Sequence, residues 1–132
     1  MTDLESRARG STAAAISNEA VRLLHDYTGR GPTKARTSIN RDSVMVLFGD
    51  TLTKGERRLA DLGDGGAVLQ MRHRFQQAMR EDLIALVEKQ MERKVIAFMS
   101  ANHLDPDMAV EVFVLEPLPE GEQPPTAENE ED

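Results

Sequence analysis

The sequence predicts a single α+β domain whose elements follow the order α-ββ-α-α-ββ. Apolar residues recur every three or four positions in two long segments, at about residues 12–28 and 67–94. Two pairs of short, β-branched apolar runs are each separated by polar turn residues, which is typical of hairpins. The length of 132 residues is that of one domain. These features favour a four-stranded antiparallel sheet with the helices on one face and one long helix.

The first helix is expected at about residues 12–28. Ser11 or Thr12 can cap its start, and Gly29 suits a left-handed residue just after its end. Its apolar side chains have helical spacing: Ile16, Ala20, Leu23, Leu24 and Tyr27.

Two hairpins complete the predicted sheet. The first turns at residues 40–42, and its second strand, residues 44–48, is expected to be more buried than its first. The second hairpin pairs residues 95–99 with residues 110–115. The loop of the second hairpin contains turn-forming residues, one of them an imidazole and two of them carboxylates: Asn102, His103, Asp105, Pro106 and Asp107.

Two helices are expected between the hairpins. Thr53 and Glu56 have the spacing of a capping box for a short helix that ends near Gly63. The next helix, at about residues 67–94, would be roughly 40 Å long. Its predicted apolar stripe is Val68, Met71, Phe75, Met79, Leu83, Leu86, Val87 and Met91. A small sheet cannot cover so long a stripe, so we expect one end to kink, protrude or pack on a partner chain.

Composition indicates a soluble cytoplasmic protein. Hydrophobic residues make up 39% and charged residues 30%, and cysteine is absent, which leaves no disulfide or thiolate chemistry. No apolar run is long enough to span a membrane. The net charge of −7 comes mostly from the C-terminus, because six of the 23 acidic residues follow residue 117. We expect a flexible arm at residues 1–12, the domain at 13–117 and a disordered acidic tail at 118–132.

The stretch "GRGPTKART" at residues 29–37 combines a turn with positive charge. A nucleotide-binding P-loop follows a strand and opens a helix, and here that order is inverted. A structural role would use Gly29, Gly31 and Pro32 to end the helix and stiffen the turn. An anion or an acidic partner surface would instead contact the basic side chains Arg30, Lys34, Arg36 and Arg41. Aromatic residues are only 4% of the chain, which argues against stacking on nucleic acid.

The stretch "NHLDPDM" at residues 102–108 also allows two interpretations. His103, Asp105 and Asp107 could form a weak metal site or an acid–base pair. Asn, Asp and Pro are also the ordinary residues of a hairpin connection, and the stretch lacks the ligand spacing of established metal motifs. His25 and His73 have no partners that can be identified from sequence. We therefore assign no catalytic residue, no metal ligand and no cofactor.

Three motifs together resemble the bacterial MpsC-like family: G-x-G-P-x-x-A-R at residues 29–36, F-x-x-A-M-R at 75–80, and N-H-x-D-P-D at 102–107 followed by E-V-F-V-L-E-P. The resemblance runs from about residue 16 to residue 117. The family name implies association with a cation-translocating, membrane-potential-generating system. The signature positions implied by the resemblance are Gly29, Gly31, Pro32, Arg36, Arg80, His103, Asp105, Pro106 and Asp107.

The sequence therefore predicts an accessory or regulatory protein that acts by binding and that forms homo-oligomers, with a dimer as the first expectation. The long helix or an edge strand would provide the contact between copies. The basic loop would bind an anionic ligand or an acidic partner, and association with a membrane transport system would be peripheral. One alternative is a metal- or anion-dependent small-molecule binder or enzyme that uses both loops. The other is a nucleic-acid-binding regulator.

Overall fold

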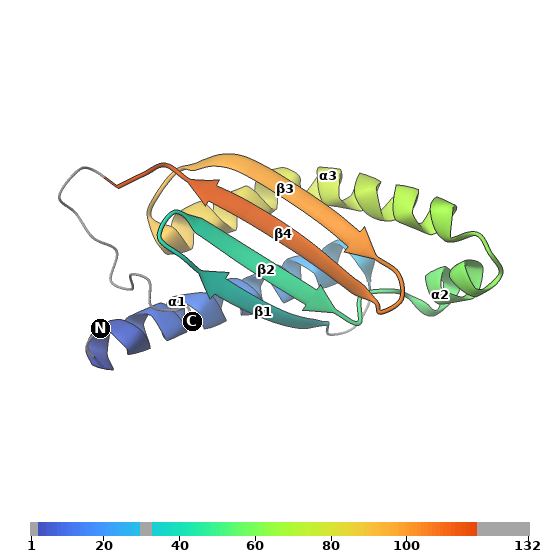
Figure 1. Cartoon of the computed structure of the whole chain (residues 1–132), viewed down its shortest axis with the longest axis horizontal. Coiled ribbons are helices and arrows are strands. Elements are labelled where there is room, and N and C mark those ends of the chain that lie inside the picture. Colours follow the sequence, from blue (N-terminus) through green and yellow to red (C-terminus); the bar gives the residue numbers. More distant parts are fainter. Residues whose placement is uncertain (1–2, 30–32, 119–132) are drawn as a thin grey trace.

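The structure is a computed structural model that describes residues 3–29 and 33–118. The helices are α1 (Asp3–Thr28), α2 (Lys54–Asp61) and α3 (Gly65–Met91). The strands are β1 (Lys34–Ile39), β2 (Ser43–Gly49), β3 (Val95–His103) and β4 (Met108–Leu115). The strands form one antiparallel sheet in the order β1-β2-β4-β3. Helices α1 and α3 lie behind this sheet in Figure 1, so the predicted α+β fold and element order are confirmed.

Helix α1 begins earlier than the apolar periodicity predicts. It starts at Asp3 rather than near Thr12, and Figure 1 shows its N-terminal part extending past the sheet. The predicted start was wrong because the added segment has no apolar repeat from which a helix could be identified. The predicted end is confirmed: Gly29 has a φ of 72°, and its N–H donates a 2.7 Å hydrogen bond to the carbonyl of His25.

Alternation along the strands decides which face of the sheet is buried. Val44, Val46 and Phe48 on β2 are almost fully buried, as are Phe113 and Leu115 on β4. These side chains pack against Ile16 and Ala20 of α1 and against Met79, Leu83 and Val87 of α3. As predicted, β1 is less buried than β2. The core is therefore a single layer between the sheet and the two long helices.

Strand β3 is longer than predicted, which moves part of the "NHLDPDM" stretch into the sheet. The strand continues to His103, so Asn102 and His103 pair with Ala109 and Met108 of β4. The turn itself is confined to residues 104–107. Strand pairing thus gives Asn102 and His103 opposite orientations, one toward the helices and one away from them.

The capping box of α2 is present as predicted. The backbone N–H of Glu56 donates to Thr53 Oγ1 at 3.1 Å, and the N–H of Thr53 donates to Glu56 Oε1 at 2.8 Å. Helix α3 follows closely and ends at Met91, with Glu92 in the left-handed conformation at a φ of 55°.

The buried stripe of α3 differs from the predicted one. Its buried residues are Val68, Arg72, Gln76, Met79, Leu83 and Val87. Met71, which was expected on the stripe, is 49% exposed, because Arg72 takes the position four residues after Val68. From Met79 onward the chain's own sheet and α1 cover the apolar side chains. Leu69 and Met71 are the large hydrophobic residues of α3 that remain exposed, so this helix offers a partner little apolar surface.

Candidate functional site

The face of the sheet that α1 and α3 leave uncovered is apolar, and we call it the open face. It is the face toward the viewer in Figure 1. It is formed by the strand residues that alternate with the buried ones: Met45, Leu47, Ala97, Met99, Ala101, Met108, Val110, Val112 and Val114.

Strand register aligns these side chains in rows across the sheet. Val112 on β4 pairs with Met45 on β2 and with Met99 on β3, so one row crosses three strands. Met45 is 38% exposed and Met99 is 53% exposed. A contiguous apolar surface of this kind usually marks an interaction site.

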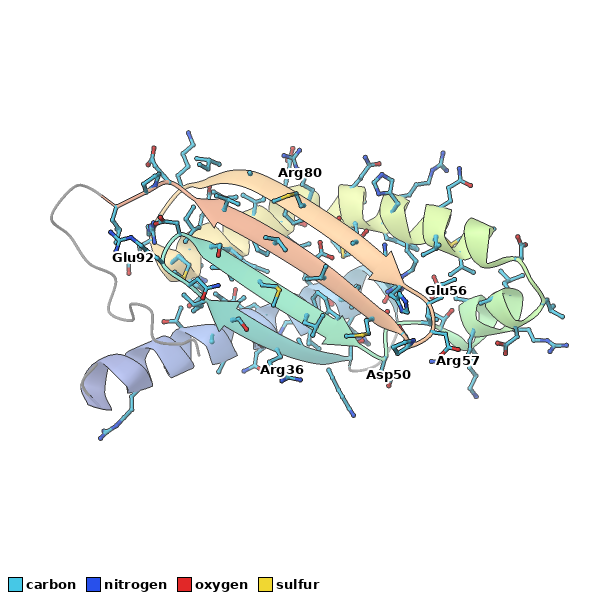
Figure 2. All side chains as sticks on the ribbon, viewed as in Figure 1. Arg36, Asp50, Glu56, Arg57, Arg80 and Glu92 are labelled. Atoms are coloured by element: carbon cyan, nitrogen blue, oxygen red, sulfur yellow. The ribbon has the colours of Figure 1, made fainter. Side chains whose placement is uncertain are left out.

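Charge is confined to the margins of the open face. Lys34 and Arg36 lie on the edge strand β1, and His103 lies at the end of the opposite edge strand β3. No strand residue on this face is acidic, and the structure describes all of the strand residues. The side chains of Lys34 and Arg36 make no hydrogen bond or ion pair with the described residues, and Figure 2 shows Arg36 at the outer margin of the sheet.

A polar cluster lies on the other side of the sheet, beneath α3. Glu111 on β4 is 2% exposed, and its Oε2 accepts a 3.0 Å hydrogen bond from Nε2 of Gln76. Oε1 of Gln76 in turn accepts a 2.8 Å bond from Nδ2 of Asn102 on β3. Burial raises the pKa of Glu111 to about 7, although the bond from Gln76 and the charge of Arg72 oppose this rise.

Arg72 connects this cluster to α2. Its Nη1 donates a 3.2 Å hydrogen bond to the carbonyl of Thr51 and lies 3.5 Å from Glu56 Oε1. Both members of this ion pair are largely buried. Glu56 is also the third residue of α2 and completes its capping box, so one carboxylate both accepts a hydrogen bond from the N–H of Thr53 and neutralises the arginine.

Asp107 performs a structural task at the turn between β3 and β4. Its carboxylate accepts hydrogen bonds from Thr51 Oγ1 at 2.8 Å and from the N–H of Leu52 at 2.9 Å, and Arg57 Nη2 lies 3.3 Å away. Burial alone would raise the pKa of Asp107, but these bonds and the charge of Arg57 outweigh it and lower the pKa. Figure 2 shows Arg57 beside Asp50 at this end of the sheet, and their side chains are 3.7 Å apart.

The other residues of the "NHLDPDM" stretch have local roles. His103 Nδ1 lies 2.8 Å from the carbonyl of Pro106, across the turn. Asp105 is exposed, and Asp107 is bonded to the segment before α2 rather than to His103. Within the residues that the structure describes, no group of three or more His, Cys, Asp or Glu residues could hold a metal ion.

The predicted basic residues are dispersed. Lys34 and Arg36 lie on β1, whereas Arg41 lies in the β1–β2 turn, where its carbonyl accepts a 2.8 Å bond from Arg93 Nη1. Arg30, Gly31 and Pro32 lie outside the described residues. Arg80, a position implied by the family resemblance, lies at the edge of the sheet beside β3 in Figure 2. Its Cζ is 5.9 Å from the centre of the Phe98 ring.

The two predicted loops do not form one site. Arg36 and His103 lie on the two edge strands, separated by three strand spacings or about 14 Å. A small ligand held by both would have to reach across the whole sheet. The small-molecule interpretation therefore gains no support from the arrangement of these residues.

The polar cluster was not among the predicted sites, although two signals for it were present in the sequence. Glu111 stands at the same strand parity as Ala109, Phe113 and Leu115, which predicts that it faces the core. Arg72 and Gln76 likewise continue the helical stripe between Val68 and Met79. Polar residues at apolar positions of a repeat were the signal that could have identified the cluster.

Comparison with known protein families finds a match over most of the chain. The model of the family described as MpsC, the Na+-translocating membrane potential-generating system, matches residues 8–117. No curated protein and no solved structure matches the chain. Of the helices in residues 3–29 and 33–118, none is both long enough and apolar enough to cross a membrane.

Proposed function

Since the chain belongs to the MpsC family, we propose that it is an accessory binding component of a membrane-potential-generating system and that two copies associate through their open faces. The family description supports the first part of this proposal. The uncovered apolar face of the sheet supports the second part, and it is the observation on which the proposal mainly rests.

The size of the open face agrees with a weak to moderate dimer. Four strands about 4.8 Å apart and about seven residues long give a face of roughly 20 by 25 Å, or on the order of 500 Å². Two such faces in contact would remove on the order of 1,000 Å² from water, which is near the lower limit for a specific interface. Dimerisation would therefore depend on protein concentration.

A second copy suits this face better than a charged partner does. The centre of the face carries no charge that could select an oppositely charged surface, and an apolar sheet face is complementary to itself. Two sheets pack face to face about 10 Å apart in β-sandwiches, and a two-fold axis gives both copies the same contacts. Repulsion between the Lys34 and Arg36 side chains of the two copies favours a two-fold axis that runs parallel to the strands. This axis places β1 of one copy over β3 of the other, so the cations of the two copies lie at opposite edges of the interface.

The same two cations are the proposed contact for an acidic surface of the partner system. Both are exposed and unpaired among the described residues, and both lie at the margin rather than the centre of the open face. Marginal charges act mainly on the rate and the salt dependence of association. Reversal of both charges, in the variant Lys34→Glu/Arg36→Glu, should weaken binding of a poly-glutamate peptide without abolishing the dimer.

Sedimentation equilibrium of matched methionine variants tests the dimer. Met99 on the open face and Met71 on α3 are 53% and 49% exposed, so Met99→Glu and Met71→Glu place the same charge at equally exposed positions on different surfaces. We expect Met99→Glu to raise the dimer dissociation constant at least tenfold and Met71→Glu to leave it unchanged.

Two results would reject the proposed interface. A wild-type chain that stays monomeric up to its solubility limit would exclude self-association altogether. Dissociation by Met71→Glu but not by Met99→Glu would instead place the contact at the exposed residues of α3.

A further inference from the structure

A small cavity lies beside the polar cluster, between α3 and the sheet. Its volume is about 10 Å³. Leu24 of α1, Phe48 of β2 and Met79 of α3 are among its apolar lining residues. Its polar lining comes from Thr28, Thr51, Arg72, Gln76, Asn102 and Glu111.

One buried polar atom in this lining has no partner. Oε2 of Glu111 accepts the bond from Gln76, but Oε1 makes no hydrogen bond with any described residue. A buried carboxyl oxygen without a hydrogen bond carries a desolvation penalty, and native proteins rarely leave such a group unsatisfied. The cavity thus adjoins a group that requires a small hydrogen-bonding ligand.

We propose that this cavity is a proton-linked water site, in which one water molecule bonds to Glu111 Oε1 and the buried carboxyl group binds its proton more tightly in the folded chain than in the unfolded chain. A volume of about 10 Å³ is near the minimum for a single water molecule, and a buried water requires two to four polar partners. The polar lining residues supply that number. Water suits either form of Glu111, because it donates to a carboxylate and accepts from a carboxylic acid.

The charges around the cavity favour water over an ion. Arg72 on α3 is the one other charged residue in its lining, and α1, β2 and β3 contribute uncharged residues there. The guanidinium of Arg72 disfavours a metal cation, and the carboxyl group of Glu111 disfavours an anion. Burial, which raises the pKa of Glu111 to about 7, supports the tighter binding of the proton in the folded chain.

Two measurements on the wild-type chain test this site. A high-resolution crystal structure at pH values on either side of 7 should show one water molecule within hydrogen-bond distance of Glu111 Oε1. Carbon-13 NMR of the side-chain carboxyl groups should show Glu111 half-protonated near pH 7, with Glu111→Gln removing that resonance. Glu81→Gln, at an exposed position of α3, is the matched control and should leave the resonance unchanged.

Each measurement has an outcome that would overturn the proposal. An empty cavity, or a protein group bonded to Oε1, would reject the water site. Titration of Glu111 near the ordinary glutamate pKa of 4.5 would reject the tighter binding of the proton. If Glu111→Gln fails to fold, correlation of the carboxyl carbon with its own side-chain carbons assigns the resonance in the wild-type chain.

Discussion

Gln76 on α3 donates a 3.0 Å hydrogen bond to Glu111 on β4, and both residues are almost fully buried. The bond that Gln76 accepts from Asn102 fixes the orientation of its amide group. The side chain of Gln76 therefore joins α3 to both strands of the second hairpin, β3 and β4. Because burial penalises the charged form of Glu111, the stability of this junction depends on the protonation of a single carboxyl group.

The free energy of unfolding should fall as the pH rises from about 4.5 to above 7. The pKa of Glu111 is raised from 4.5 to about 7 on folding, so the folded state binds the proton more tightly than the unfolded state. The stabilising effect of this proton is complete below the pKa of Glu111 in the unfolded chain, and it is lost as the pH rises through the pKa of Glu111 in the folded chain. We expect a loss of roughly 3 kcal/mol, measured by urea unfolding across this range.

Glu111→Gln is the variant that isolates this effect, because it keeps the shape and the acceptor oxygen but cannot ionise. The difference in unfolding free energy between wild type and variant removes every contribution that the two chains share. A difference that stays constant from pH 4.5 to above 7 would show that Glu111 does not carry the pH dependence.

The order of helices and strands could be predicted from the sequence because periodicity is a local property. The alternation of Val44, Val46 and Phe48 indicates which side of a single strand is buried, and the Thr53–Glu56 pair indicates where a single helix begins. The prediction that Met71 lies on the buried stripe of α3 was wrong for a related reason. Apolar spacing admits either residue 71 or 72 on the stripe, and only the polar partners Thr51 and Glu56 place Arg72 inside.

The pairing of residues within the candidate sites could not be predicted, because it depends on contacts across the sheet. Glu111 and Gln76 are 35 residues apart, and nothing in their local sequence pairs them. The open face likewise requires the strand order β1-β2-β4-β3, which puts Met45 and Met99 on either side of Val112. Local patterns predict that each strand has a second face, but not that the helices leave it uncovered.

Asp107→Asn should lower the free energy of unfolding by about 1–3 kcal/mol, because it weakens the bonds that tie the β3–β4 turn to Thr51 and Leu52. The difference in stability between wild type and variant should disappear in acid. The pKa of Asp107 is lowered on folding, so its carboxylate stabilises the fold above the unfolded pKa of 3.8 and loses this effect as the pH falls through the folded pKa. Urea unfolding at neutral and acid pH measures both effects. Asp105→Asn, at an exposed position in the same turn, is the control and should change stability little. Equal losses in both variants would mean that the bonds of Asp107 are not the cause.

Arg93→Lys should open the junction between the β1–β2 turn and the end of β4. The guanidinium of Arg93 donates to the carbonyls of Arg41 and Glu116 and to Asp42 Oδ1, at 2.7–2.8 Å. A lysine ammonium lacks the planar fork that reaches three acceptors at once, so we expect a loss of about 1–3 kcal/mol. Hydrogen exchange should accelerate at the N–H groups of Leu115 and Glu116, which bond to this junction. The exposed neighbouring variant Lys94→Ala is the control, and equally fast exchange in both variants would argue against a specific role for Arg93.

Gly10, within α1, and Gly29, directly after its end, should respond in opposite directions to the same substitution. A Cβ added at Gly10 or at Gly29 would have no heavy atom within 4 Å, so neither alanine would clash and the backbone conformation alone decides the outcome. Gly29 has a φ of 72°, where alanine costs about 1–2 kcal/mol, whereas helical Gly10→Ala should stabilise the chain by up to about 1 kcal/mol. Thermal unfolding should therefore show a lower midpoint for Gly29→Ala and an equal or higher one for Gly10→Ala. A lower midpoint for Gly10→Ala would indicate that the N-terminal part of α1 is not helical in solution, and no change for Gly29→Ala would show that the helix can end without a left-handed residue.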